Sequence, residues 1–158
     1  MNIFRPNIVL DSFLDVDVQT MAEKGIRLLI CDIDNTLVPH NFPDPTDAVK
    51  DFFARLDKNG IDVCFMTNNN ADRANVFNTS FGYKVLANAK KPCKKAYYDA
   101  MNIFGVDETQ TAAIGDQIFT DIWGGNRAGV YTILVKPVEV GGEGWFIALK
   151  RKLEKLFI

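Results

Sequence analysis

The chain has 158 residues, of which 47% are hydrophobic and 24% charged, and its formal net charge is -2 at pH 7. This length and composition fit one globular domain, and a slightly acidic chain has no overall electropositive field that would favour nucleic acid as a partner. No apolar stretch approaches the roughly 20 residues of a membrane-spanning helix, and the opening MNIFRPNIVLDSFLDVD becomes acidic too early for a secretory signal.

We therefore expect a single domain over residues 1–158, with its core at about 25–136, in the cytoplasm. The cysteines Cys31, Cys64 and Cys93 have no spacing typical of a metal site, and none is followed by the arginine that completes a cysteine-dependent phosphatase loop. Cys31 and Cys64 lie in apolar runs, which predicts buried side chains and a reducing compartment.

Short apolar runs alternate with helical patterns, which predicts an α/β fold with helices on both faces of a central parallel sheet. The expected strands are Arg27–Asp32, Asp62–Thr67, a short one near Val85, Thr111–Gly115 and Tyr131–Val135. The expected helices are Thr46–Lys58, with Thr46 as a typical N-cap and Gly60 as a typical stop, then Ala71–Ser80, Lys94–Phe104 and Thr120–Ala128. The apolar positions of the opening segment suit a sheet edge or a partner surface.

Polar residues follow three of these strands. Asp32, Thr67 and Asp116 each lie at or just past a strand end. Because ligands of open α/β sheets bind outside the carboxyl ends of the strands, we expect these side chains to converge on one edge of the sheet.

The first polar group is Asp32-Ile33-Asp34-Asn35-Thr36. Two carboxylates two residues apart can both reach one reacting group, one as a nucleophile and the other as a proton donor and acceptor. Taken alone, this run is also typical of a capped, solvated turn.

Two further groups have an equally ordinary interpretation when each is taken alone. Thr67 and the asparagines after it suit a phosphate oxygen at a helix N-terminus, or simply a helix cap. Lys91, in the Lys90-Lys91-Pro92 step, could neutralise a transferring phosphoryl group, although exposed lysine pairs are common.

The last group is Gly115-Asp116-Gln117-Ile118-Phe119-Thr120-Asp121. Its two aspartates bracket a turn that opens a helix, and Gly115 permits close approach of the backbone. Carboxylates of this kind hold Mg²⁺ together with a substrate phosphate. Helix capping would explain either aspartate, but not the pair beside an apolar strand.

In this order, the four groups resemble the motifs of the haloacid dehalogenase (HAD) superfamily of phosphohydrolases, matched by DIDNT, Thr67, Lys91 and GDQIFTD. The match spans roughly Leu28 to Val135. The DNTLVP run, the Lys-Pro step and GDQIFTDIWGGNRAGVYTILV are most similar to the small capless branch, subfamily III, which includes bacterial proteins related to mitochondrial phosphatidylglycerophosphate phosphatase. The resemblance implies a three-layer, Rossmann-like fold without a cap domain.

The resemblance also implies roles for individual carboxylates. Asp32 would attack phosphorus and form an aspartyl-phosphate, while Asp34 would protonate the leaving oxygen and later deprotonate water. Mg²⁺ would be held by Asp32, the main-chain carbonyl of Asp34, and Asp116. Because Asp34 is an aspartate, transfer to water is preferred over dehalogenation or ATP-driven transport, and a phosphomutase or phosphotransferase stays open.

The remaining site residues follow from the same resemblance. Thr67, assisted by the Asn68 amide, would bind a phosphoryl oxygen. Lys91 would stabilise the developing charge and orient Asp32, and Asp121 would support the metal from the second shell or bind it directly.

The spacing between the motifs leaves no room for a cap: 32 residues separate Asp34 from Thr67, and 23 separate Thr67 from Lys91. An open site suits a large or surface-bound substrate, or closure by a second subunit, so a homodimer is an expectation.

The C-terminal segment, Gly141-Gly142-Glu143-Gly144 and WFIALKRKLEKLFI, predicts a basic amphipathic helix over about 144–157. Such a helix can lie on an anionic membrane, which would make the protein a peripheral membrane protein, or it can pack its apolar stripe on the domain.

His40 suits a solvated loop or a substrate contact. Arg127 suits a turn-stabilising role or a contact with a substrate headgroup.

The sequence thus predicts a magnesium-dependent phosphate monoester hydrolase. Phosphatidylglycerophosphate is the specific substrate hypothesis, with a role in phospholipid biosynthesis. A soluble metabolite, a nucleotide and a phosphoprotein are the alternative substrates, and a non-catalytic binding protein on the same scaffold is the alternative from another class.

Overall fold

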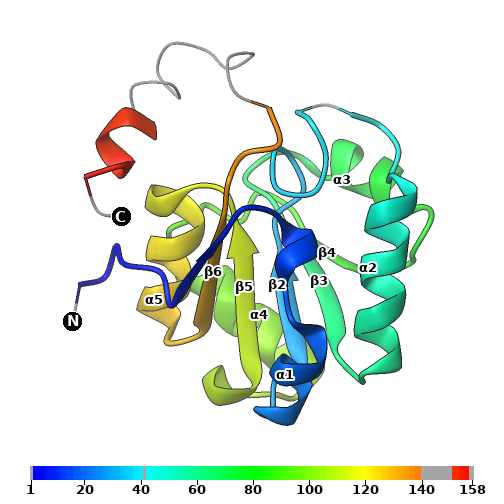
Figure 1. The fold of residues 1–158 in the computed structure, drawn as a ribbon, viewed down its shortest axis with the longest axis horizontal. Helices are drawn as coiled ribbons and strands as arrows, with labels where there is room; N and C mark the ends of the chain where they lie inside the picture. The colour runs from blue at the N-terminus through cyan, green and yellow to red at the C-terminus, as the bar shows by residue number, and fades with distance from the viewer. Residues whose placement is uncertain (1, 41, 140–150, 157–158) are drawn as a thin grey trace.

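The computed structural model describes residues 2–40, 42–139 and 151–156. A central sheet lies between helices that cover both of its faces (Figure 1). The sheet is parallel throughout, with six strands in the order β1-β6-β5-β2-β3-β4. These strands are β1 (Ile8–Leu10), β2 (Leu28–Cys31), β3 (Asp62–Met66), β4 (Lys84–Leu86), β5 (Thr111–Gly115) and β6 (Tyr131–Val135).

The strands are connected mainly by helices, as parallel strands require. The α-helices are α1 (Val18–Glu23), α2 (Asp47–Lys58), α3 (Ala71–Asn78), α4 (Lys95–Phe104) and α5 (Trp123–Ala128). Shorter elements are 3₁₀ turns at Phe13–Asp15 and Glu108–Gln110, and a π-helix at Ile118–Ile122.

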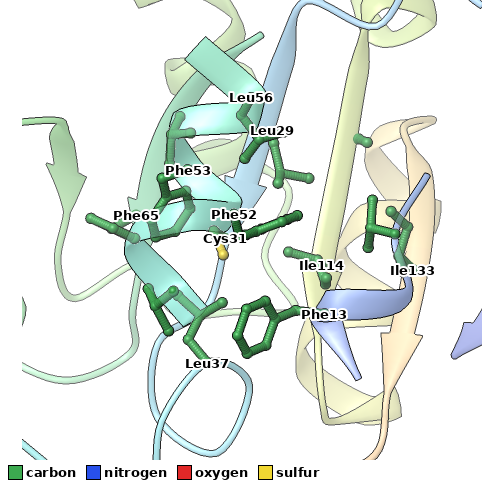
Figure 2. Packing of buried hydrophobic residues seen from close by; sticks show 14 of the residues in the cluster. Phe13, Leu29, Cys31, Leu37, Phe52, Phe53, Leu56, Phe65, Ile114 and Ile133 are labelled. Carbon is green, nitrogen blue, oxygen red and sulfur yellow. The ribbon is translucent and has the colours of Figure 1, made fainter. Parts of the chain in front are cut away.

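The sheet buries both of its faces, so its central strands are apolar without alternation. Along β2, Leu29 and Cys31 join the core cluster that contains residues of α1, α2 and α3, whereas Leu28 and Ile30 join the cluster that contains residues of α4 and α5. Figure 2 shows Phe52 of α2 packing in the first of these clusters, close to the sheet residues. This two-sided burial is typical of a parallel sheet and holds β2 rigidly in its centre.

The order of the strands places a switch point at the end of β2. From β2 the chain adds β3 and then β4 on one side, and it returns to place β5 and then β6 on the other side. The residues that follow β2 and β5, Asp32 and Asp116, therefore lie beside each other where open α/β sheets bind ligands.

The predicted α/β class, with its parallel sheet and two helical layers, is confirmed. All five expected strands and all four expected helices are present, with ends shifted by up to a few residues. The last helix differs most, because α5 is preceded by a π-helix that already begins at Ile118. The opening segment does cover a sheet edge, since its residues Ile8–Leu10 pair with β6 as a further parallel strand that the sequence did not predict. As expected, Cys31 and Cys64 are buried.

No helix in the described ranges is long and apolar enough to cross a bilayer. The predicted C-terminal helix over 144–157 lies largely outside the described residues, but residues 151–154 are helical. In Figure 1 this terminal helix lies beside the segment that follows β5. A cavity of about 420 Å³ lies elsewhere, among α1, β1 and β6, and is lined by none of the predicted site residues.

Candidate active site

The turn after β2 presents the first pair of carboxylates. Asp32 continues the sheet by donating its N–H to the carbonyl oxygen of Ile114, at 3.1 Å. The chain then folds back sharply, since the N–H of Asn35 donates to the carbonyl oxygen of Val38 at 2.7 Å, with Asn35 at a φ of 60°. Asparagine tolerates this left-handed conformation better than most residues. The turn therefore leaves both Asp32 and Asp34 at the carboxyl edge of the sheet.

Thr36, from the same turn, links the two central carboxylates. Its hydroxyl oxygen lies 3.0 Å from Oδ2 of Asp32 and 3.2 Å from Oδ1 of Asp116, and the residue is only 1% exposed. A hydroxyl has one proton, so it can donate to one of the two carboxylates at a time. This contact brings the ends of β2 and β5 together at side-chain level.

Lys91 places its ammonium group among three oxygen atoms. Nζ donates to Oδ1 of Asp121 at 2.6 Å, to Oδ1 of Asp32 at 3.0 Å and to the carbonyl oxygen of Met66 at 3.1 Å. The Lys91 side chain is 5% exposed. Burial alone would lower the pKa of Lys91, but the charges of Asp121 and Asp32 outweigh it and raise that pKa well above its usual value. Lys91 is therefore a fixed, permanently charged cation beside Asp32.

Asn68 holds the loop that carries Lys91. Its side-chain oxygen accepts the Lys91 N–H at 2.7 Å, and its side-chain N–H donates to the Lys91 carbonyl oxygen at 3.2 Å. Thr67 is 6% exposed, and its hydroxyl oxygen accepts the N–H of Asn69 at 3.1 Å. Because this oxygen is the acceptor, the hydroxyl proton can still be donated to a phosphate. The side chain of Asn68 is occupied with the lysine loop, and its predicted phosphate contact stays a prediction.

Asp121 lies against the backbone at Gly115. A Cβ at position 115 would lie 2.3 Å from Cγ of Asp121, so only glycine fits there. The other oxygen of Asp121, Oδ2, accepts the N–H of Gln117 at 3.1 Å. The predicted close backbone approach at Gly115 is thus confirmed, and its partner is the second aspartate of the same motif.

Asp116 meets the C-terminal segment. The guanidinium of Arg151 forms an ion pair with Oδ2 of Asp116 and also donates to the main-chain oxygen of Asp116, at 3.1 Å. Three residues further on, the buried carboxylate of Glu154 accepts the N–H of Phe119 at 3.0 Å. Residues 151–154 are therefore attached directly to the loop after β5. Part of the predicted basic segment thus packs on the domain, with Arg151 directed to the carboxylates rather than to solvent.

A second arginine lies beside Asp34. Nη2 of Arg73, in the first turn of α3, is 3.0 Å from Oδ1 of Asp34, and the two side chains are 16% and 13% exposed. Arg73 and Arg151 were not predicted as site residues. A cation in the first turn of a helix opposes the helix dipole, and this was the one signal in the sequence that could have drawn attention to Arg73.

The clustering of carboxylates makes their ionisation costly. Burial raises the pKa of Asp32; Lys91 opposes this shift, and the neighbouring Asp121 and Asp116 add to it. Burial also raises the pKa of Asp116, and the charge of Asp121 raises it further. A site that needs Asp32 as a carboxylate would therefore gain from an additional positive charge.

The donor atoms fit a divalent cation. One oxygen each from Asp32, Asp116 and Asp121 lie within 4.8 Å of one another. Carboxylate oxygens are the ligands that hard cations prefer. Within the described part of the chain, these three carboxylates form ion pairs with Lys91 and Arg151. Both the chemistry and the charge of the site are suited to a bound divalent metal ion.

Two other predicted contacts lie at the margin of this site. His40 is exposed in the loop before Asn41. Arg127, in the last turn of α5, donates to the carbonyl oxygen of Pro92 at 3.2 Å and lies over the ring of Trp123, and both of its predicted roles stay predictions.

Comparisons with known proteins identify a family and its relatives. A family model described as haloacid dehalogenase-like hydrolase matches residues 42–129. The chain is 32% identical to "Probable phosphatase YqeG" of Bacillus subtilis, over 96% of this chain and 88% of that protein. It is 26% identical to "Phosphatidylglycerophosphate phosphatase 1, chloroplastic/mitochondrial" of Arabidopsis thaliana, over 94% of this chain but only 45% of that protein.

A solved structure shares the fold. It is the cobalt-bound form of the deoxy-D-mannose-octulosonate 8-phosphate phosphatase from Haemophilus influenzae, with a TM-score of 0.53 and 19% identity over 86% of this chain and 91% of that one. At this level of identity the match shows a common architecture.

Proposed function

The chain belongs to the haloacid dehalogenase-like hydrolases and is a phosphatase of that family, and we propose that it hydrolyses phosphate monoesters with Asp32 as a covalent nucleophile. The observation that carries this proposal is the contact of Lys91 with Asp32, at 3.0 Å, at the switch point of the sheet. There a buried ammonium group holds one oxygen of a carboxylate at the place where the fold binds ligands.

Each residue of the site has its own role in the proposed reaction. An oxygen of Asp32 attacks phosphorus as the bond to the leaving oxygen breaks, and Asp34 gives that oxygen a proton. Water then attacks the phosphorus of the aspartyl-phosphate and loses a proton to Asp34, which returns Asp32 as a carboxylate. Lys91 orients Asp32 and offsets the negative charge that gathers on the phosphoryl oxygens, while Thr67 donates its hydroxyl to one of them.

Mg²⁺ is the cation that we propose for the carboxylate cluster. Asp32, Asp116 and the main-chain carbonyl of Asp34 would hold it, and Asp121 would support them through its contact with Lys91. The bound cation would supply positive charge that lets a carboxylate and a phosphate approach each other. Asp121 could also act as a direct ligand, since one of its oxygens lies in the same cluster.

Phosphatidylglycerophosphate is the substrate that we propose, because relatives from two organisms carry its phosphatase in their names. The chain spans about half the length of these two relatives. A single domain over residues 1–158 without a cap leaves room for a lipid headgroup presented at a membrane surface. A soluble metabolite, a nucleotide or a phosphoprotein is the rival substrate, and a homodimer is the proposed assembly.

Phosphate release from phosphatidylglycerophosphate in mixed micelles tests both parts of this proposal. The assay compares the wild type with Asp32→Asn, each with Mg²⁺ and with EDTA. Release that needs both the metal and Asp32 supports the mechanism and the lipid substrate. Release from 4-nitrophenyl phosphate but not from the lipid would reject the lipid substrate, and release that survives Asp32→Asn would reject the nucleophile.

A further inference from the structure

Arg73 is unusual because two of its three guanidinium nitrogen atoms have no hydrogen-bond partner within the described residues. Arginine has five N–H donors, and here Nη2 bonds to Asp34 while Nε and Nη1 are buried with no hydrogen-bond partner within the described residues. Leaving a buried donor unpaired costs at least as much free energy as a typical hydrogen bond contributes. The two unpaired nitrogen atoms of Arg73 therefore lower the stability of the folded protein, and such an exception needs an explanation.

The position of Arg73 on its helix adds a second cost. It is the third residue of α3, where the exposed N–H groups of the helix already carry partial positive charge. An acidic or neutral side chain would suit this position better than a guanidinium. Helix stability thus gives no reason for an arginine at position 73.

What the side chain does gain is a fixed orientation. The guanidinium carbon lies 5.7 Å from the ring centroid of Phe77, one turn further along α3. Phe77 is fully buried, and its own ring packs at 5.7 Å from that of Phe65 in the centre of the core. Because this aromatic platform cannot shift, it holds the guanidinium in one plane, with Nη2 directed at Asp34.

The partner is the one side chain whose placement matters most for proton transfer. The turn at residues 33–38 fixes the main chain of Asp34 through its backbone hydrogen bonds. Arg73 holds one oxygen, Oδ1, at 3.0 Å. This contact limits the directions in which the carboxyl group of Asp34 can present a proton.

We propose that Arg73 is a positioning residue that holds the carboxyl group of Asp34 in place for proton transfer to and from the substrate. This inference rests on the proposed function, in which Asp34 protonates the leaving oxygen. Arg73 itself makes no contact with the reacting atoms. Its unpaired donors and its place in the first turn of α3 reduce the stability of the fold, and the placement of Asp34 offsets that loss functionally.

The test compares two esters whose leaving groups differ in their need for a proton. 4-Nitrophenolate departs easily without one, whereas phenolate does not. Arg73→Met should lower kcat/KM about 100-fold on phenyl phosphate but less than about 10-fold on 4-nitrophenyl phosphate. The ratio kcat/KM is compared because it reports the step in which the leaving oxygen departs, and not the later hydrolysis of the aspartyl-phosphate that both esters share. The variant removes two buried nitrogen atoms that lack a hydrogen-bond partner, but it also removes the cation of Asp34. Because these effects oppose each other, its melting temperature should stay close to that of the wild type.

Arg55→Met is the matched control. Arg55 also lies over a phenylalanine ring, that of Phe52 at 5.7 Å, but it is an exposed residue near the end of α2. Its replacement should leave both reactions unchanged.

The possible outcomes separate this inference from the proposed function. If the wild type releases phosphate from neither ester, the proposed function fails first. If wild-type release depends on Asp32, an equal loss of kcat/KM on both esters would contradict the positioning role of Arg73. A rise in KM of the same size for both esters at constant kcat, unchanged kinetics, or a clear loss of stability in Arg73→Met would contradict it as well.

Discussion

Lys91 and Asp121 form the most deeply buried ion pair of the site. Their charged atoms are 2.6 Å apart, and the two side chains are 5% and 6% exposed. The same ammonium group also holds Asp32, so one lysine joins the nucleophile to the motif after β5. A charge pair withdrawn from water in this way stabilises a protein only while both partners are present.

Replacing this lysine should therefore destabilise the whole domain. Lys91→Met leaves Asp32 and Asp121 buried without their cation, and we expect the free energy of unfolding to fall by about 3–5 kcal/mol. Urea denaturation measures this change. Lys95→Met is the control, because the Lys95–Asp99 pair has the same 2.6 Å separation on an exposed helix surface. Its loss should change stability by less than about 1 kcal/mol, and equal losses in the two variants would show that burial of Lys91 is unimportant.

Gly115→Ala should disturb the site from the backbone side. The added methyl group would overlap the carboxyl group of Asp121, so Asp121 must move and its contact with Lys91 must lengthen. We expect a loss of about 1–3 kcal/mol in stability together with a large drop in kcat.

Gly60→Ala separates the two effects of Gly115→Ala. Gly60 has a φ of 71° with nothing within 4 Å of an added Cβ, so an alanine there strains the backbone without touching the site. It should cost about 1–2 kcal/mol in stability and leave kcat unchanged. A Gly115→Ala variant with normal kcat would contradict the placement of Asp121.

Arg151 and a divalent cation compete for the charge of Asp116. A guanidinium and a divalent ion that both bind this carboxylate would repel each other. We therefore expect Arg151→Gln to bind Mg²⁺ at least about 10-fold more tightly in isothermal titration calorimetry, which corresponds to about 1.4 kcal/mol. Lys152→Gln removes the same charge from an exposed neighbour and should leave the affinity unchanged. Weaker binding by Arg151→Gln would mean that Arg151 orients Asp116 for the metal instead.

The metal-free protein should lose stability as the pH rises. Burial, opposed by Lys91 and reinforced by Asp121 and Asp116, raises the pKa of Asp32 to about 8, against about 3.9 in an unfolded chain. A raised carboxyl pKa favours the folded state fully below the unfolded value, and this contribution disappears as the pH passes the folded value. Urea denaturation in EDTA should show this loss between about pH 4 and pH 8. The loss should be smaller in Asp32→Asn, where only the raised pKa of Asp116 remains. Parallel profiles for the two proteins would contradict the shift.

The sequence predicted the part of the site that is encoded next to strands. Asp32, Asp34 and Asp116 directly follow buried apolar runs, so the geometry of a parallel sheet brings them together whatever the loops do. Gly115 could be interpreted for the same reason, because a glycine at a strand end beside two aspartates indicates a close approach.

The contacts that the sequence did not reveal depend on tertiary packing. Arg151 reaches Asp116 from 35 residues away, and Arg73 reaches Asp34 from 39. No local pattern predicts such pairs, because their distance is set by how the helices lie on the sheet. The strand at Ile8–Leu10 was missed because its residues alternate poorly, and it forms only where β6 offers an edge.

Trapping the aspartyl-phosphate intermediate is the most direct test of Asp32 as the nucleophile. The protein is mixed with Mg²⁺ and an excess of 4-nitrophenyl phosphate, quenched in acid during turnover and examined by peptide mass spectrometry. We expect the added mass of one phosphoryl group on the peptide that contains Asp32, and none in Asp32→Asn. Turnover by the wild type with no phosphoryl group on Asp32, or with the group on another residue, would contradict Asp32 as the nucleophile.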